Sequence, residues 1–190
     1  VREARAGLVN CAEPEEPVAT PAKKRAVAGK GGKANIVLAR LDYRLLHGQV
    51  VFSWVNSVAA QRIIVVDDAA NDEIKKGALK LAKPAGVYLN VYTVEKALSK
   101  MEKLNTLGEN VMFVFGNVHE MLEFLTSYKL PEVNFGAAAN HDGAEPVGGK
   151  DSSVFLDVAE KADAQKIIDL GVKVYEQQTP TQPRTDITSF

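Results

Sequence analysis

From about residue 35 onward, short apolar runs alternate with segments that have the periodicity of amphipathic helices. The run IIVV at 63–66 is typical of a buried strand, whereas Val51, Trp54 and Val55 fall on one face of a helix. Strands that alternate with helices are joined by crossover connections and form parallel sheets covered on both faces. The sequence therefore predicts an α/β fold, a doubly wound three-layer sandwich with a mainly parallel central sheet.

Periodicity and turn residues together place the individual elements. Strands are predicted at 35–40, 62–66, 87–92, 110–115, 133–135, 154–156 and 172–176, and helices at 48–58, 72–82, 93–101, 118–127 and 157–170. Asp157 and Glu160 match a capping box, and Gly171 marks the end of the helix that they open. Ligands of such sheets bind at the carboxyl ends of the strands, so a site is expected among the loops 41–49, 67–71, 116–117 and 136–149.

Residues 1–34 have a different composition, rich in Ala, Pro, Gly and charged residues, as in EPEEP at 13–17 and PAKKR at 21–25. Such sequences lack a sustained period and are typical of flexible linkers, although an expression remnant is an alternative. We therefore expect a linker over 1–34 and one domain over 35–190. The first residue is Val1 rather than Met, which leads us to expect that a further segment precedes it in a longer polypeptide.

Charge and cysteine content restrict the partners and the compartment. The 23 basic and 24 acidic side chains nearly cancel, so the net charge indicates neither a nucleic-acid partner nor an anionic membrane. The single cysteine, Cys11, has no internal partner for a disulfide, so a reducing, cytoplasmic location is expected. No apolar run approaches the roughly 20 residues that cross a bilayer.

The loop LDYRLLHGQV at 41–50 carries the residues best suited to catalysis. The imidazole of His47 offers a neutral nitrogen as a nucleophile near pH 7, and Arg44 is suited to bidentate bonds with phosphate oxygens. Gly48 allows close approach of the backbone at the start of a helix, whose first amides attract anions. Asp42 is suited to orient the imidazole or to hold Arg44, and Gln49 is a further supporting candidate.

The stretch from 36 to 68, IVLARLDYRLLHGQVVFSWVNSVAAQRIIVVDD, resembles the IIB component of the mannose, fructose and sorbose family of the sugar phosphotransferase system. The resemblance continues through AKPAGV at 82–87, VMFVF at 111–115, VNFG at 133–136 and 157–171, and so covers nearly all of 35–179. In that family an Ala/Pro-rich tether often joins IIB to a IIA domain, and residues 1–34 resemble such a tether.

The resemblance implies a phosphoryl relay. A IIA phosphohistidine would donate to His47, at its Nδ1 atom, and His47 would pass the group to a sugar held by membrane IIC and IID subunits. Arg44 matches the arginine of the family motif. No metal or cofactor is implied, and the expected location is cytoplasmic, in peripheral contact with the permease. A homodimer is a further possibility, and the sugar is not indicated.

Two segments depart from the family pattern. The family usually has two adjacent acids before the arginine, whereas the second position here is Tyr43. The loop that usually begins Gly-Gly-Met is here GAAANH at 136–141. The first change leaves the carboxylate function to Asp42 alone, and the second weakens any assignment of the sugar by analogy.

Several other interpretations of the same residues stay open. His47 is alternatively a surface or helix-capping histidine, and Arg44 an ion-pair partner of Asp42 or Asp68. His119 and His141 are expected to be solvated side chains, because their separation has no metal-ligand spacing.

Alternative functions also stay open at this stage. Asp67 and Asp68, at the end of the second strand, support a rival function as a receiver-like signalling module phosphorylated on aspartate. A non-catalytic sugar or nucleotide binder is a third possibility, although no Gly-x-Gly-x-x-Gly follows the first strand.

Overall fold

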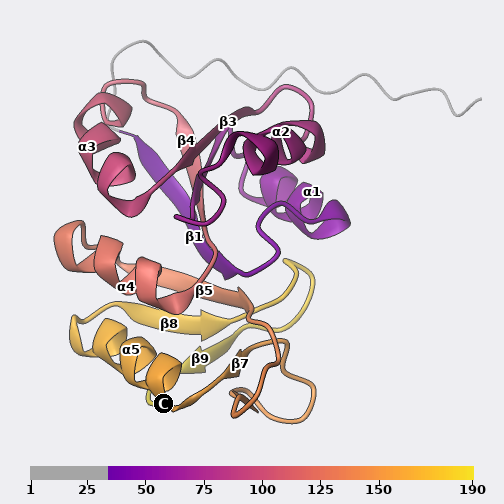
Figure 1. Ribbon diagram of the computed structural model, residues 1–190, viewed down its shortest axis with the longest axis vertical. Helices are drawn as coiled ribbons and strands as arrows, with labels where there is room; N and C mark the ends of the chain where they lie inside the picture. Colours follow the sequence, from indigo (N-terminus) through magenta and orange to yellow (C-terminus); the bar gives the residue numbers. More distant parts are fainter. Residues whose placement is uncertain (1–33) are drawn as a thin grey trace, which may run out of the picture.

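The protein folds as a twisted sheet of seven strands with helices on both faces (Figure 1). The structure, a computed structural model, describes residues 34–190. The predicted linker and Cys11 lie outside these residues, apart from Ala34 at the linker's end. The sheet strands are β1 (Asn35–Asp42), β2 (Arg62–Val66), β3 (Tyr88–Tyr92), β4 (Asn110–Phe115), β5 (Glu132–Ala137), β8 (Lys173–Glu176) and β9 (Thr185–Ile187).

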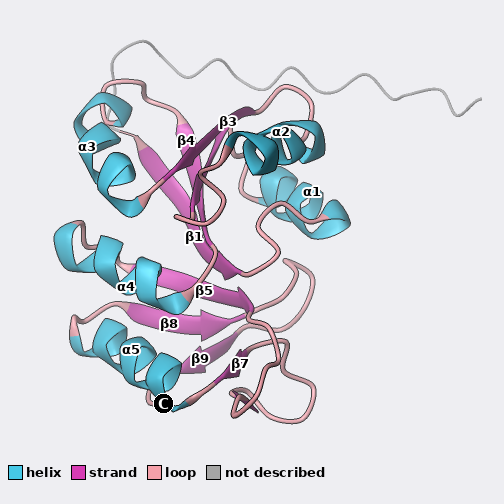
Figure 2. Cartoon of the chain, in the orientation of Figure 1, coloured by secondary structure: helices cyan, strands magenta, loops and turns pink. Residues whose placement is uncertain are grey.

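The strand order is β3-β2-β4-β1-β5-β8-β9, and every pair is parallel except β8 with β9. The helices are α1 (Gly48–Ser57), α2 (Glu73–Ala82), α3 (Val94–Leu104), α4 (Val118–Ser127) and α5 (Val158–Asp169). Figure 2 shows these helices outside the central sheet, as the doubly wound prediction requires. The predicted fold class is therefore confirmed.

Two hydrophobic cores lie on opposite faces of the sheet. Side chains of α1 and α2 pack on one face, against residues such as Ile63 and Val65 of β2. Those of α3, α4 and α5 pack on the other face, against residues such as Phe113 and Phe115 of β4. Alternate residues of β2 and β4 therefore serve opposite cores, which explains why these strands are apolar throughout.

Local capping signals explain where the helices begin. Asp72, Thr93 and Asn117 each accept a hydrogen bond from the amide three residues later, at the start of α2, α3 and α4. The capping box of Asp157 and Glu160 at the start of α5 is present as predicted.

Three short strands complete the fold. In the predicted strand at 154–156, Val154 forms a parallel bridge with Ala138 just beyond β5, and Phe155–Leu156 form β7, which pairs with β6 (Glu145–Pro146). Strands β6 and β9 were not predicted. β9 (Thr185–Ile187) has little apolar character of its own and is held by antiparallel pairing with β8, a long-range contact that local periodicity does not report.

Candidate functional site

The direction of the connections changes at the carboxyl end of β1. The chain leaves β1 toward α1 on one face of the sheet, whereas it leaves the neighbouring strand β4 toward α4 on the other face. Loops that diverge in this way leave room above the strand ends, where ligands of doubly wound sheets bind. Residues 43–47, between β1 and α1, occupy this position.

The backbone of this loop is tightly fixed. The amide of Leu45 donates to the carbonyl of Asp42 at 2.9 Å, and the amide of Arg44 donates to Asp42 Oδ1 at 3.1 Å. Leu45 has a φ of +58°, a left-handed conformation that costs a non-glycine residue about 1–3 kcal/mol. Leu46 is buried in the α1 core and anchors the loop from below. Strained backbone held by its surroundings is typical of functional loops.

His47 lies at the N-cap of α1 with its side chain exposed to solvent. The imidazole makes no side-chain capping bond to the helix. The amides of the first turn of a helix have no intrahelical partners and attract anions. Gly48 follows with a φ of +38°, and a Cβ placed on it would meet no heavy atom within 4 Å. The imidazole and the start of α1 therefore face open space.

Arg44 lies three residues before His47 in the same loop, and its side chain is 25% exposed. Its Nε donates to Asp42 Oδ1 at 3.3 Å, and its Cζ is 5.5 Å from the centre of the Tyr43 ring. The Nη2 atom is buried and has no hydrogen-bond partner among residues 34–190. An unpaired guanidinium nitrogen is costly to bury, so this atom is suited to an anionic ligand.

Asp42 links Arg44 to a second, fully buried arginine. Arg40 donates from Nη2 and Nε to Asp42 Oδ2, at 2.9 and 3.3 Å. Its Nη1 donates to the side chain of Asn134 at 2.7 Å and to the Gln177 carbonyl at 3.1 Å. Burial lowers the pKa of Arg40, and the charge and hydrogen bonds of Asp42 oppose that shift. The two arginines thus hold one carboxylate between them.

A bulge in β5 makes room for the Arg40 guanidinium. Leu41 pairs with Phe135 and Asp42 with Ala137, so Gly136 is an extra residue between two paired positions. A Cβ on Gly136 would overlap the guanidinium group of Arg40. On α1, the ring of Trp54 lies 5.6 Å from Arg40 Cζ, and its Nε1 donates to the Gln178 carbonyl.

The structure brings Asp42 and Arg44 into contact, and it places His47 at the end of the same loop and Gly48 at the first position of α1. Asp42 was expected either to orient the imidazole or to hold Arg44, and its contacts match the second function. The predicted supporting residue Gln49 lies in α1, but its side chain is outside the described part of the structure. Arg40 was not predicted to belong to the site, although a charged residue inside an otherwise apolar strand was a signal for it.

The acidic residues of the rival hypothesis have structural hydrogen bonds. Asp67 Oδ1 accepts the Ala70 amide at 2.6 Å, and Asp68 Oδ1 accepts the Val94 amide at 3.3 Å. Glu120 accepts the Asp68 amide, and burial, assisted by both aspartates, raises the pKa of Glu120. These contacts tie the loops after β2, β3 and β4 together.

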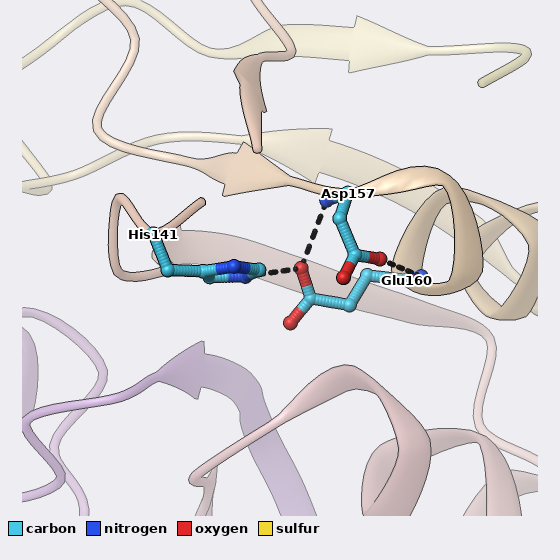
Figure 3. Close-up of side chains that lie close together, drawn as sticks. All are labelled: His141, Asp157 and Glu160. Atoms are coloured by element: carbon cyan, nitrogen blue, oxygen red, sulfur yellow. Dashed lines mark hydrogen bonds and ion pairs between the residues drawn. The ribbon is translucent and has the colours of Figure 1, made fainter. Parts of the chain in front are cut away.

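His141 meets two acidic residues at the start of α5 (Figure 3). Its Nε2 lies 3.1 Å from Glu160 Oε2, which also accepts the Asp157 amide, and this hydrogen bond to Glu160 raises the pKa of His141. One ligand atom each of His141, Asp157 and Glu160 lies within 4.8 Å of the other two, so these three residues could hold a metal ion. Both carboxylates already form the capping box, so we interpret the contact as a link between the 136–153 loop and α5.

The other histidine, His119, is largely exposed at the start of α4, and its Nδ1 lies 3.0 Å from Asp163 Oδ2 on α5. Trp54, on the apolar face predicted for its helix, is buried. Within residues 34–190, no helix has the length and apolar character needed to cross a bilayer.

Residues 36–190 match the family model of the phosphotransferase system sorbose subfamily IIB component. The chain is 32% identical over 154 residues to the sorbose-specific EIIB component of Klebsiella pneumoniae, covering 80% of this chain and 92% of that protein. It is also 31% identical over 167 residues to the mannose-specific EIIAB component of Escherichia coli K12, covering 87% of this chain and 50% of that protein.

The fold likewise matches a solved structure. The crystal structure of the IIBSor domain of the sorbose permease from Klebsiella pneumoniae superposes with a TM-score of 0.72 at 31% identity, covering 81% of this chain and 94% of that one. These matches do not support the alternative of a receiver module phosphorylated on Asp67 or Asp68.

Proposed function

Because the chain belongs to the sorbose subfamily of IIB components of the sugar phosphotransferase system, we propose that His47 is the residue on which it carries the phosphoryl group. The observation that carries this proposal is the exposed imidazole of His47 at the start of α1, free of any capping bond to that helix. The chain is a phosphocarrier in sugar uptake, as its family is, and its phosphotransferase chemistry requires a nucleophile accessible to both donor and acceptor.

The first transfer is from a phosphohistidine donor to His47. A neutral imidazole nitrogen of His47 attacks phosphorus as the bond to the donor nitrogen breaks, so that the phosphoryl group moves and the donor imidazole leaves with its electron pair. The transition state spreads negative charge over the equatorial oxygens. Arg44, whose side chain is 25% exposed, meets this charge once its guanidinium turns toward the phosphate, and the first amides of α1 add to it.

The second transfer sends the group from His47 to a sugar hydroxyl. The hydroxyl oxygen attacks phosphorus, the bond to the His47 nitrogen breaks, and the hydroxyl proton passes to a base or to solvent. Asp42 keeps Arg44 in place through both steps, since its carboxylate is itself held by the buried Arg40. Asp42 and Arg40 are therefore positioning residues rather than groups that touch the phosphate.

The partners follow from the same assignment. The donor is a IIA domain, which the Escherichia coli EIIAB relative, as its name states, carries together with IIB. The acceptor is a sugar held by membrane IIC and IID subunits, and the chain works in the cytoplasm against that permease. The relatives named here differ in their sugar, so the substrate is a sugar of this family without further specification.

The decisive experiment uses all three histidines of the chain. The full chain and its His47→Ala, His119→Ala and His141→Ala variants are incubated with a phosphorylated IIA donor, and protein-bound phosphate is measured. We expect loss of labelling only for His47→Ala, with a circular dichroism spectrum like that of the unchanged protein.

The chemical stability of the label provides an independent check. A phosphohistidine survives alkali and is lost in acid, whereas an aspartyl phosphate is lost in alkali. Normal labelling of His47→Ala, or an alkali-labile phosphate, would refute the assignment of His47.

A further inference from the structure

A cavity lies between strand β3 and helix α3, on the face of the sheet opposite to α1 and α2 (Figure 1). Its volume is about 430 Å³, which is within the range of cavities that hold small molecules. β2 and β4 separate β3 from β1 in the sheet, so the cavity is distinct from the loop that carries His47. A ligand in this cavity would leave that loop uncovered.

One wall of the cavity carries a row of lysines on α3. At about 100° per residue, Lys96, Lys100 and Lys103 fall within about 60° of the helix circumference. Lys100 and Lys103 line the cavity, and Lys96 Nζ lies 5.4 Å from the centre of the Tyr92 ring, which also lines it. Residues three apart on a helix are neighbours, so the ammonium groups of Lys100 and Lys103 can reach one anion together.

The charge of Lys100 and Lys103 is not neutralised by neighbouring acids. The acids of α3, Glu95 and Glu102, lie about 80° or more around the helix from each lysine of the row. Among residues 34–190, no carboxylate forms an ion pair with Lys100 or Lys103. Two uncompensated positive charges therefore border the cavity, and they attract an anion.

Other lining residues suit the uncharged part of a ligand. Arg62 is already paired, since its Nε donates to Glu109 at 2.6 Å and its Nη1 donates to Asn90 Oδ1 at 2.7 Å. The second bond holds the Asn90 oxygen on Arg62 and leaves the N–H donors of that amide for a ligand hydroxyl. The ring of Tyr92 and the side chain of Leu104 offer apolar surface to the carbon atoms of a ligand.

We propose that this cavity binds a phosphorylated sugar, with its phosphate between Lys100 and Lys103. A phosphate monoester carries nearly two negative charges at neutral pH, and two ammonium groups without carboxylate partners match them. Asn90 and Tyr92 contact the hydroxyls and carbon atoms of the sugar. A nucleic acid fits less well, because the whole chain has a net charge of −1 and these lysines border one cavity rather than an extended basic surface.

The class of ligand is consistent with the family of the chain. A sugar phosphate is the product of sugar phosphotransfer, so the process in which a IIB component takes part forms this ligand. The choice of a sugar ester rests on that family membership. It does not require His47 to be the phosphorylated residue, because the labelling of histidine variants tests His47 and the binding of a sugar phosphate tests the cavity. Each proposal can therefore fail without the other.

The test titrates the isotope-labelled full chain with glucose 6-phosphate, with glucose and with inorganic phosphate, and follows the amide resonances by NMR. We expect saturable shifts in β3 and α3 with glucose 6-phosphate, none with glucose, and binding of inorganic phosphate that is about tenfold weaker because the sugar contacts are missing. Lys100→Gln/Lys103→Gln should weaken the binding of glucose 6-phosphate about tenfold or more. Lys80→Gln/Lys83→Gln makes the same change of charge at the end of α2 and should bind like the unchanged chain.

Four results would overturn the proposal. The first is the absence of saturable shifts in β3 and α3 with glucose 6-phosphate. Equal binding of glucose would mean that the phosphate is not recognised, and equal binding of inorganic phosphate would mean that the sugar is not. An equal loss in the two double variants would indicate a general effect of charge rather than a site. The circular dichroism spectrum of Lys100→Gln/Lys103→Gln should match that of the unchanged chain, which shows that the variant is folded.

Discussion

Replacing Gly136 by alanine is expected to displace the buried guanidinium of Arg40. The new Cβ would overlap Arg40 Cζ and both terminal nitrogens. The guanidinium has little freedom to move, because Asp42, Asn134 and the Gln177 carbonyl all accept its hydrogen bonds. Either β5 moves away from β1, or part of this buried network breaks.

Movement of β5 and breakage of the buried network set the lower and upper limits of the loss in unfolding free energy. Overpacking that is relieved by small backbone shifts costs about 1–3 kcal/mol. Breaking a buried ion pair, here Arg40 with Asp42, costs about 3–5 kcal/mol, since one charge is left without its partner. We therefore expect Gly136→Ala to lower the free energy of unfolding by about 1–5 kcal/mol, or the melting temperature by about 2–20 °C.

The assay is urea unfolding, with thermal unfolding as a second measurement. The control is Gly77→Ala in α2, where a Cβ would meet no heavy atom within 4 Å. That change should stabilise the protein by about 0.5–1 kcal/mol, because alanine favours a helix over glycine. If Gly136→Ala unfolds within about 0.5 kcal/mol of the unchanged protein, the argument that Gly136 exists to accommodate Arg40 is wrong.

Two further predictions concern charged groups. Arg44→Ala should slow phosphoryl transfer to His47 by about a hundredfold in single-turnover labelling while leaving the acceptor intact, and an unchanged rate would assign Arg44 to structure alone. His141→Gln tests the raised pKa of His141. Protonated His141 beside Glu160 stabilises the folded state fully below the unfolded pKa of about 6.5, and this stabilisation disappears as pH rises through the higher pKa of the folded state. The melting temperature of His141→Gln should therefore fall below that of the unchanged protein at pH 5 and converge with it in alkali; a gap that grows with pH would contradict this.

The fold could be predicted well where local signals and burial agree. Strands β2 and β4 are apolar throughout because both of their faces are covered, and α5 begins at a capping box that the sequence displays. β9 was missed because a three-residue polar strand is held by pairing with β8, which no local pattern reports. The strand predicted at 154–156 is present, because Val154 forms a parallel bridge with Ala138 just beyond β5 and Phe155–Leu156 form β7, which pairs with β6.

The sequence indicated the loop of the candidate site but not the buried residues that hold Asp42 in place. The order of Asp42, Arg44 and His47 between a strand and a helix was by itself a modest signal, and the resemblance of residues 36–68 to the IIB family pointed to this loop; the roles of these residues stay a prediction. The sequence did not choose between the two functions considered for Asp42. That choice depends on Arg40 and Asn134, which lie 94 positions apart in the chain and meet only because β1 and β5 are neighbours.

Short-range order along the chain therefore determined the α/β architecture, the helix starts and the loop that presents His47, since periodicity and capping act over a few residues. Tertiary structure alone decided that Arg40 is buried beneath that loop, that Gly136 makes room for it, and that α2 turns Ile74 and Leu81 toward solvent. These features depend on which surfaces meet after folding. Burial and charge pairing are properties of the packed molecule, and residues far apart in the chain create them.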